Sequence, residues 1–353
     1  MPKIELDCKE KFKFAIIFYH LTFCFASLYY SFDYSNECDA ENIFRIASEA
    51  ENINSLIGIG TIFISFLIYP LIKIGFNYIL LTILFSVISL KGFLIYGDMF
   101  FKTDLKKRAD TFLFIILFFL PSYHFWTSFV GKDAVVFYLM AIVLSNVFNM
   151  KRINLFFITS IILILVIRPY IFFILLLSYL LNFIFNPELG KEKKIKVILF
   201  SLAVGFLTLP ILQKFLKLED IKIENIKENY NRIILYSQRN GNSSINLEKS
   251  SYLERLMLVL FRPFFYESIR PFHILASIEN TIVWLSIIKF FTSIKRINLY
   301  KIKEIIFPVM AFVLLILFYS VYMYNLGLAS RMRVMYMPYM LFSIYWIVIK
   351  HKN

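Results

Sequence analysis

The chain has 353 residues, of which 59% are hydrophobic and 19% aromatic, and its mean hydropathy is +0.69. A soluble globular protein is excluded, because a core of this size cannot hide so many Phe, Ile and Leu side chains. The net charge of +14 does not indicate nucleic-acid binding, since Lys and Arg fall in short clusters between apolar runs, as in the cytoplasmic loops of membrane proteins.

Apolar runs recur along the whole chain, and each has roughly the 20 residues that a helix needs to cross a bilayer core of about 30 Å. They predict an all-α, polytopic helical membrane protein whose residues 1–353 form a single integral membrane domain. The first run is expected to be retained, because no small-residue cleavage pattern follows the basic N-terminus. The candidate spans are 14–32, 54–72, 77–97, 112–127, 133–149, 153–168, 170–186, 196–216, 273–292, 305–324 and 334–350.

The distribution of Lys and Arg predicts which side of the membrane each loop occupies. Both basic termini are expected to be cytoplasmic, which makes the acidic loop 33–53 and the large loop 217–272 external. An odd number of spans would put the termini on opposite sides, so one candidate must fail to cross. We expect this to be 112–127, because its apolar part is short before Pro121, and we expect the segment to be re-entrant. About ten transmembrane helices then remain.

Two local patterns predict further helical detail. Residues 152–186 are too many for one crossing, because about 34 residues would span roughly 50 Å. Pro169 disfavours helical geometry at Arg168 and suits the first position of a new helix, so two short helices with Arg168 at their turn are predicted. In the large loop, apolar residues recur at nearly helical spacing from Leu218 to Ile234, which predicts an amphipathic helix on the outer membrane surface.

The most informative polar stretch runs from Pro121 to Asp133, between two apolar runs. Ionisable groups at membrane depth are costly and usually functional. Lys132 suits phosphate capture, with Asp133 as the N-cap of the next helix and as orienting partner, and with Trp126 as a sugar contact. Alternatively, the stretch is a plain helix cap at the membrane interface, with Trp126 as an interfacial aromatic residue.

Arginines stand at the predicted external ends of other spans, where the positive-inside rule disfavours them. The planar fork of Arg168 suits bidentate contact with phosphate; alternatively, its side chain snorkels to the interface. The stretch 262–271 is either a surface for sugar stacking or a re-entry turn, and the two arginines that open the last span are alternatively interfacial anchors. The predicted pyrophosphate-binding cations are Lys132, Arg168, Arg262, Arg270, Arg331 and Arg333.

Carboxylates and aromatic rings complete the predicted site. A carboxylate in the acidic loop is able to act as general base towards a sugar hydroxyl; Asp33 is as available there as Asp39, and the loop alternatively serves only topology and solubility. The three cysteines have no metal-ligand spacing, so neither a metal nor a cofactor is predicted. The candidate catalytic residues are Asp39, Asp133 and Glu267. The predicted sugar contacts are Trp126, Tyr170 and Tyr266.

These motifs, in this order, resemble bacterial polytopic proteins of surface-polysaccharide gene clusters. These are the O-antigen polymerases of the Wzy type and related lipid-sugar-dependent glycosyltransferases of the GT-C type. The first-loop Asp39 resembles the acidic residue that GT-C enzymes use as catalytic base. The resemblance covers most of the chain and is carried by Pro121–Ser128, Gly131–Asp133, Arg168–Tyr170, Arg262–Glu267 and Ser330–Arg333.

The resemblance implies an enzyme that polymerises oligosaccharide repeat units linked to undecaprenyl pyrophosphate. The product would be O-antigen or capsule-type polysaccharide, made at the outer leaflet of the bacterial inner membrane, with membrane lipids, a chain-length regulator and a flippase as further partners. The first alternative is a GT-C-type glycosyltransferase that adds a single sugar from a polyprenyl-phosphate donor. The others are a flippase of lipid-linked glycans and an assembly subunit without catalysis.

Overall fold

The structure is a computed structural model that describes residues 2–34, 38–101, 115–116, 118–149, 154–186, 188–238, 244–267, 271–294 and 305–350. The regular secondary structure of these residues is helical. An isolated antiparallel β-bridge joins Ser244 and Asn325. The predicted all-α class is therefore confirmed for the described residues. The chain divides into two units, Met1–Leu105 with Phe118–Arg168, and Lys106–Leu117 with Pro169–Asn353.

Several helices are long and apolar enough to cross a membrane. Within the described ranges, 3 qualify by length and composition: Lys9–Asp33, Tyr78–Phe101 and Lys191–Phe215. A fourth is added if the bent pair Pro121–Thr127 and Lys132–Phe148 forms one broken span. These helices fit a membrane protein, whereas the total of about ten crossings stays a prediction. Shorter apolar helices cover Thr61–Lys73, Leu155–Ile167, Pro169–Ile184, Ile274–Ile288 and Ile306–Tyr322.

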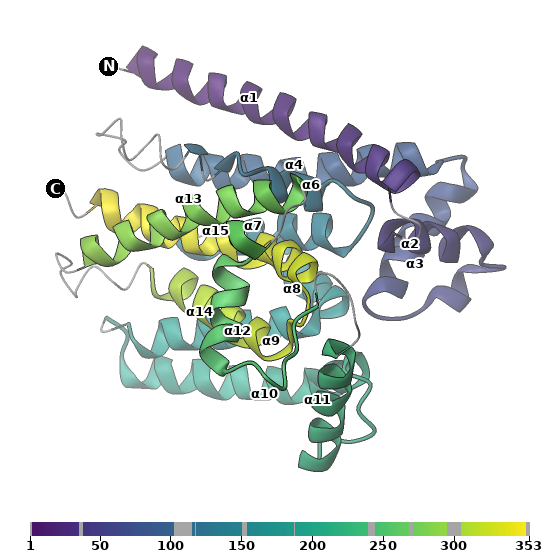
Figure 1. The fold of residues 1–353 in the computed structure, drawn as a ribbon. Helices are drawn as coiled ribbons and strands as arrows, with labels where there is room; N and C mark the ends of the chain where they lie inside the picture. The colour runs from purple at the N-terminus through teal and green to yellow at the C-terminus, as the bar shows by residue number, and fades with distance from the viewer. Residues whose placement is uncertain are drawn as a thin grey trace. The chain divides into compact units, whose positions relative to one another are not determined.

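In the first unit, α4 packs against α1, α6 and α7, and α7 packs in turn against α8, while α2 packs against α3 (Figure 1). Small buried residues such as Ser86, Ser89 and Gly92 line α4, which lets neighbouring helices approach closely in a membrane protein. The elements of this unit are α1 (Pro2–Tyr29), η1 (Tyr30–Tyr34), α2 (Asp39–Glu49), η2 (Ile53–Leu56), α3 (Thr61–Lys73), α4 (Tyr78–Phe101), α6 (Pro121–Thr127), α7 (Lys132–Phe148) and α8 (Leu155–Ile167).

Gly92 lies where α4 packs tightly against α7. A Cβ atom at this position would lie 2.9 Å from Cδ1 of Phe137 and 3.1 Å from the backbone Cα of Tyr138. Both distances are shorter than ordinary van der Waals contact, and the backbone atom cannot rotate away. Glycine is therefore required here for packing rather than for its backbone conformation.

The last helix, α15 (Leu326–Lys350), begins eight residues before the predicted span 334–350 and contains Arg331 and Arg333, and two other predicted spans differ more. Within the candidate 54–72, the α-helix begins only at Thr61. Gly60 before it has φ 69° and ψ −122°, a conformation that suits glycine and does not occur inside a helix. The candidate 112–127 contains the short helix α6, and the chain bends by 111° between α6 and α7. The chain is therefore broken after Thr127, while residues 112–114 and 117 of this candidate lie outside the described residues, so its failure to cross the membrane stays a prediction.

The predicted pair of short helices in 152–186 is confirmed. The helix α8 ends at Ile167, and α9 (Pro169–Ile184) begins two residues later. Arg168 between them has φ −142° and ψ 77°, outside the helical range, as expected for a residue that precedes proline.

In the second unit, α9 packs against both α10 and α14, and α15 packs against α12, α13 and α14 (Figure 1). Large side chains of α14 and α15 fill its core, among them Tyr319, Tyr336 and Phe342. The elements of this unit are α9, α10 (Lys191–Phe215), α11 (Ile223–Ser237), α12 (Tyr252–Phe261), η3 (Phe265–Glu267), α13 (Pro271–Ile294), α14 (Ile306–Tyr322) and α15 (Leu326–Lys350).

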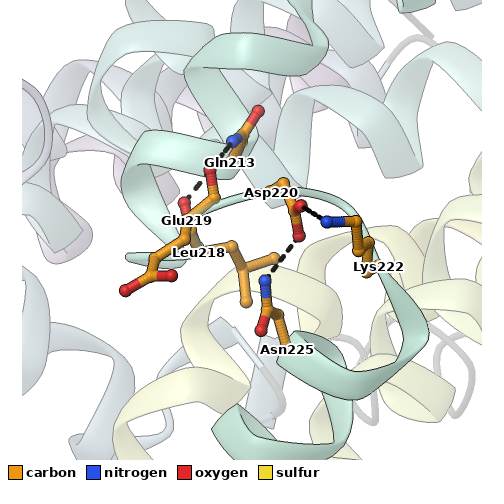
Figure 2. Close-up of polar contacts among 6 residues, drawn as sticks. All are labelled: Gln213, Leu218, Glu219, Asp220, Lys222 and Asn225. Atoms are coloured by element: carbon orange, nitrogen blue, oxygen red, sulfur yellow. Dashed lines mark hydrogen bonds and ion pairs between the residues drawn. The ribbon is translucent and has the colours of Figure 1, made fainter.

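A short polar turn joins α10 to α11 (Figure 2). Gln213 donates from Nε2 to the backbone carbonyl of Glu219 at 2.7 Å, and Asp220 accepts from Lys222 and Asn225 at 2.5 Å each. The hydrogen bond from Lys222 holds the pKa of Asp220 below its usual value. The predicted helix of the large loop is confirmed as α11, while its place on the membrane surface stays a prediction.

We expect Gly92→Ala to lower the free energy of unfolding by about 1–2 kcal/mol, because overpacking costs more than the gain in helix propensity. The midpoint of thermal unfolding of the purified protein in detergent measures this change. Gly205→Ala in α10 is the matched control, since its Cβ would meet only Cδ2 of Leu176, at an ordinary 3.9 Å. Equal shifts of the midpoint in both variants would contradict the close approach of α4 and α7.

Candidate functional site

The break between α6 and α7 is a buried polar turn. Thr127 and Ser128 are fully buried, and each hydroxyl donates to a carbonyl of the preceding turn, Thr127 to Tyr123 at 2.7 Å and Ser128 to His124 at 2.7 Å. Gly131, the N-cap of α7, has extended backbone. These hydrogen bonds satisfy polar groups whose burial without a partner would cost free energy. The break therefore has a defined structure.

An ion pair between Arg168 and Asp133 lies next to this break. Nη2 of Arg168 contacts Oδ1 of Asp133, and the two side chains are only 4% and 6% exposed. The prediction that Asp133 is the N-cap of α7 is wrong, because Gly131 takes that position and Asp133 is the second helical residue. Its carboxylate faces a buried guanidinium instead, whose attraction at low dielectric exceeds that of a backbone N–H.

Lys132 connects the same place to α3. Its half-buried ammonium donates to Oγ1 of Thr61 at 2.8 Å, and Thr61 is the first residue of α3. The N–H of Gly60 donates to the carbonyl of Val166 in α8 at 3.0 Å. The start of α3, the start of α7 and the end of α8 therefore meet around one lysine, one aspartate and one arginine.

The acidic first loop contains an amphipathic helix, α2, whereas only a loop is predicted there. Its buried residues are Ala40, Ile43 and Ala47, a helical spacing that was visible in the sequence. Cδ1 of Ile43 lies 3.8 Å from the Cβ position of Gly131, and the carbonyl of Ile43 accepts from Ser65 at 3.1 Å. Packing of α2 thus brings the helix that begins with the exposed Asp39 to the α6–α7 break.

A second arginine, Arg333, is buried in the second unit. Its Nε donates to the carbonyl of Val259 at 3.3 Å, its Nη2 to the carbonyl of Arg262 at 2.5 Å, and its Nη1 to Oδ1 of Asn280. The hydroxyl of Tyr336 also donates to the carbonyl of Val259, at 2.6 Å. These carbonyls belong to the end of α12, where backbone carbonyls have no hydrogen-bond donor within the helix. Arg333 therefore caps this end of α12.

The other predicted site residues range from buried to exposed. Arg262 is the partly exposed C-cap of α12, and Arg331 is partly exposed in α15. Tyr170 is buried, with its ring stacked on Phe318 at 4.7 Å, and Tyr266 is 84% exposed. Trp126 is half-buried and packs on Phe125, with ring centroids 5.1 Å apart. The side chain of Glu267 and the whole of Arg270 lie outside the described residues.

The structure thus brings together three of the predicted residues, Lys132, Asp133 and Arg168. Thr61 belongs with them, and it was missed because a single threonine far from the motif has no distinctive pattern in the sequence. No group of three or more His, Cys, Asp or Glu residues that could hold a metal ion occurs within the described ranges.

The fold and the site define a class: an all-helical protein, with helices long and apolar enough to span a membrane, that carries a buried ion pair at a broken helix. Comparison of the chain with protein-family models, with curated proteins and with solved structures found no match. The chemistry of the site must therefore be inferred from its own residues.

We expect Arg168→Ala and Asp133→Ala each to lower the free energy of unfolding by about 3–5 kcal/mol, because each leaves the other charge buried without its partner. The double variant Arg168→Met/Asp133→Leu should recover most of that loss. Denaturant or thermal unfolding in detergent measures these changes.

The matched control is Arg45→Ala, which removes an ion pair to Glu49 that is 3.8 Å long and has side chains 64% and 65% exposed. Little change in stability is expected there, because solvent screens exposed pairs. If Arg168→Ala proved no more damaging than Arg45→Ala, the pair would not be a buried structural constraint.

Proposed function

We propose that this protein is a membrane glycosyltransferase that polymerises lipid-linked oligosaccharide repeat units into a surface polysaccharide. The supporting observation is the meeting of Lys132 with the buried Arg168–Asp133 pair at a broken apolar helix. Ionisable groups in such surroundings are retained for a purpose, and both cations suit phosphate oxygens. A polyprenyl pyrophosphate joins an apolar tail to an anionic group, and so it matches both properties of the site.

The proposed reaction is a glycosyl transfer with pyrophosphate as the leaving group. An acceptor hydroxyl oxygen attacks the anomeric carbon of the glycan held on undecaprenyl pyrophosphate, and a new glycosidic C–O bond forms. The bond from that carbon to the pyrophosphate oxygen breaks, and the lipid pyrophosphate leaves with the electron pair. Lys132 and Arg168 stabilise the developing charge, the largest contribution in reactions of this kind.

Asp39 is the proposed general base. It is exposed at the start of α2, where water or a sugar hydroxyl can reach it, and α2 packs near Gly131 through Ile43. Asp133 is assigned a different role, because it is buried against Arg168: it fixes the orientation of the guanidinium. The proton of the acceptor hydroxyl passes to Asp39 as the new bond forms.

The proposed setting is the inner membrane of a bacterium, with about ten crossings and both termini in the cytoplasm. The acidic loop with α2 and the large loop with α11 then face outward, and the active site opens to the outer leaflet. The exposed apolar residues Ile223, Ile226 and Leu235 on α11 support a position at the membrane surface. A flippase would supply the substrate, and a chain-length regulator would act on the product.

We expect Lys132→Met to collapse the ladder of polysaccharide lengths to a single repeat, because loss of one charge-stabilising group lowers such rates about 10²-fold or more. A gel of polysaccharide from a deletion strain carrying each variant measures the ladder, and a blot of the membrane fraction confirms insertion. Lys91→Met is the matched control, since Lys91 is exposed on α4 and its ladder should be normal.

A normal ladder from Lys132→Met would refute the assignment of the site. Loss of single-repeat product in the deletion strain would favour a transferase that adds one sugar before polymerisation. Accumulation of complete repeat units on the cytoplasmic side would favour a flippase.

We expect Asp39→Asn to abolish the ladder while leaving the protein folded, because the amide keeps the shape of the side chain but cannot accept a proton. Glu49→Gln, at the other end of α2 and exposed, should leave the ladder intact. A polymer from Asp39→Asn as long as that from the wild type would assign the base to another carboxylate.

A further inference from the structure

Two histidines meet in the core of the first unit. Nδ1 of His20 on α1 lies 3.0 Å from Nδ1 of His124 on α6, and both residues are fully buried. Nε2 of His20 lies 3.0 Å from the carbonyl oxygen of Ser86 and 2.9 Å from Oγ of Ser89. Nε2 of His124 lies 3.0 Å from the carbonyl oxygen of Phe118. All four ring nitrogens therefore have hydrogen-bond partners.

The partners fix where the protons stand in the neutral pair. Nε2 of His124 faces a carbonyl, which only accepts, whereas Nε2 of His20 also meets a hydroxyl that can donate to it. Nε2 of His124 is therefore the nitrogen that carries a hydrogen, directed at Phe118, and its Nδ1 is then bare. Nδ1 of His20 must donate to that bare nitrogen, because two lone pairs at 3.0 Å would repel each other. Nε2 of His20 is bare as a result and accepts from the hydroxyl of Ser89.

One additional proton fits this arrangement without moving a ring. Placed on Nε2 of His20, it donates to the carbonyl oxygen of Ser86 at 3.0 Å. The hydroxyl of Ser89 also lies 2.9 Å from that carbonyl, so it can turn from the ring nitrogen to the carbonyl. A second additional proton has no place, since it would set two N–H groups against each other between the rings.

An aromatic ring supports the charge. The ring of Phe93 stacks on His124, with centroids 4.2 Å apart and planes 9° apart, and lies 5.1 Å from the ring of His20. The face of an aromatic ring attracts a cation at these distances, most strongly where water is excluded. The charged pair thus gains an attraction that the neutral pair lacks.

The other titratable groups of α1 and α6 near the pair are two phenols and one thiol. Tyr19 packs edge-on against His124 with ring centroids 4.8 Å apart, and Cys24 and Tyr123 are buried. None of the three is a carboxylate or an amine, so in their neutral forms they place no charge beside the histidines.

The charged groups of α4 and α7 are engaged elsewhere. On α4, Lys91 is exposed, and Asp98 forms ion pairs with two lysines of α1. On α7, Lys132 donates to Thr61 and Asp133 pairs with Arg168. Within the described residues, no third His, Cys, Asp or Glu joins the two histidines to make a metal site.

We propose that His20 and His124 form a buried binding site for one proton, which switches the pair between a neutral and a singly charged state. The site is separate from the proposed glycosyl transfer and does not depend on it. It lies within helices suited to span a membrane, α1 and α4, and at the short helix α6 that precedes the break. The carbonyl of His124 also accepts from Ser128 in that break.

Nitrogen-15 NMR of the imidazole rings in lipid bilayers, from about pH 4 to about pH 9, tests the proposal. The variant His273→Gln/His351→Gln removes the chain's other two histidines and leaves only the pair. We expect two protonated nitrogens of four at high pH, three after a single transition, and a coupling between the two Nδ1 atoms in both states. Absence of a transition, uptake of a second proton, or absence of that coupling would overturn the site.

Two variants should shift the midpoint of the transition in opposite directions. Ser89→Ala removes the donor to the bare Nε2 in the neutral pair but leaves the Ser86 carbonyl for the charged pair, so the midpoint should rise by about 0.5–1 pH unit. Phe93→Leu removes the aromatic face and should lower the midpoint by about 0.5 pH unit.

The matched control is Ser160→Ala, because Ser160 is a buried serine of the same unit whose hydroxyl donates to the carbonyl of Phe156 at 2.7 Å. Its midpoint should equal that of the parent protein. A midpoint for Ser89→Ala that matches the Ser160→Ala control, or that falls, would overturn the assigned proton positions.

Discussion

The ion pair between Arg168 and Asp133 is the constraint on which the first unit depends. Burial of either charge alone in these apolar surroundings costs free energy of desolvation, and after removal of one partner no ion-pair attraction offsets that cost. The pair also joins the second residue of α7 to the residue that ends α8. Because both residues stand at helix ends, their contact fixes where α7 begins and where the chain leaves α8.

The neighbouring features follow from that contact. With α7 fixed at its start, Lys132 reaches Thr61, and the bond from Gly60 to Val166 sets the start of α3 against the end of α8. The bend of 111° before α7 leaves a turn in which Thr127 and Ser128 satisfy carbonyls of α6. A broken helix is tolerated at membrane depth only with such partners.

The two buried arginines, Arg168 and Arg333, have different kinds of partner in an apolar interior. Arg168 faces the carboxylate of Asp133. Arg333 faces backbone carbonyls at the end of α12 and the amide of Asn280. A helix end exposes carbonyls that need donors, and the five N–H groups of arginine suit that task. The carboxylate partner of Arg168 is also next in sequence to a further cation, Lys132.

The sequence by itself determined the helical class, the turn at Arg168 and the helix α11, because apolar length, proline geometry and helical periodicity are local properties. It also marked Lys132, Asp133 and Arg168 as unusual, since charge in an apolar run is visible without a fold. Only the tertiary structure decided that Asp133 pairs with Arg168 rather than capping α7, that Thr61 meets Lys132, and that His20 meets His124. Those contacts join residues on different helices, and their partners are chosen by packing, which no local pattern encodes.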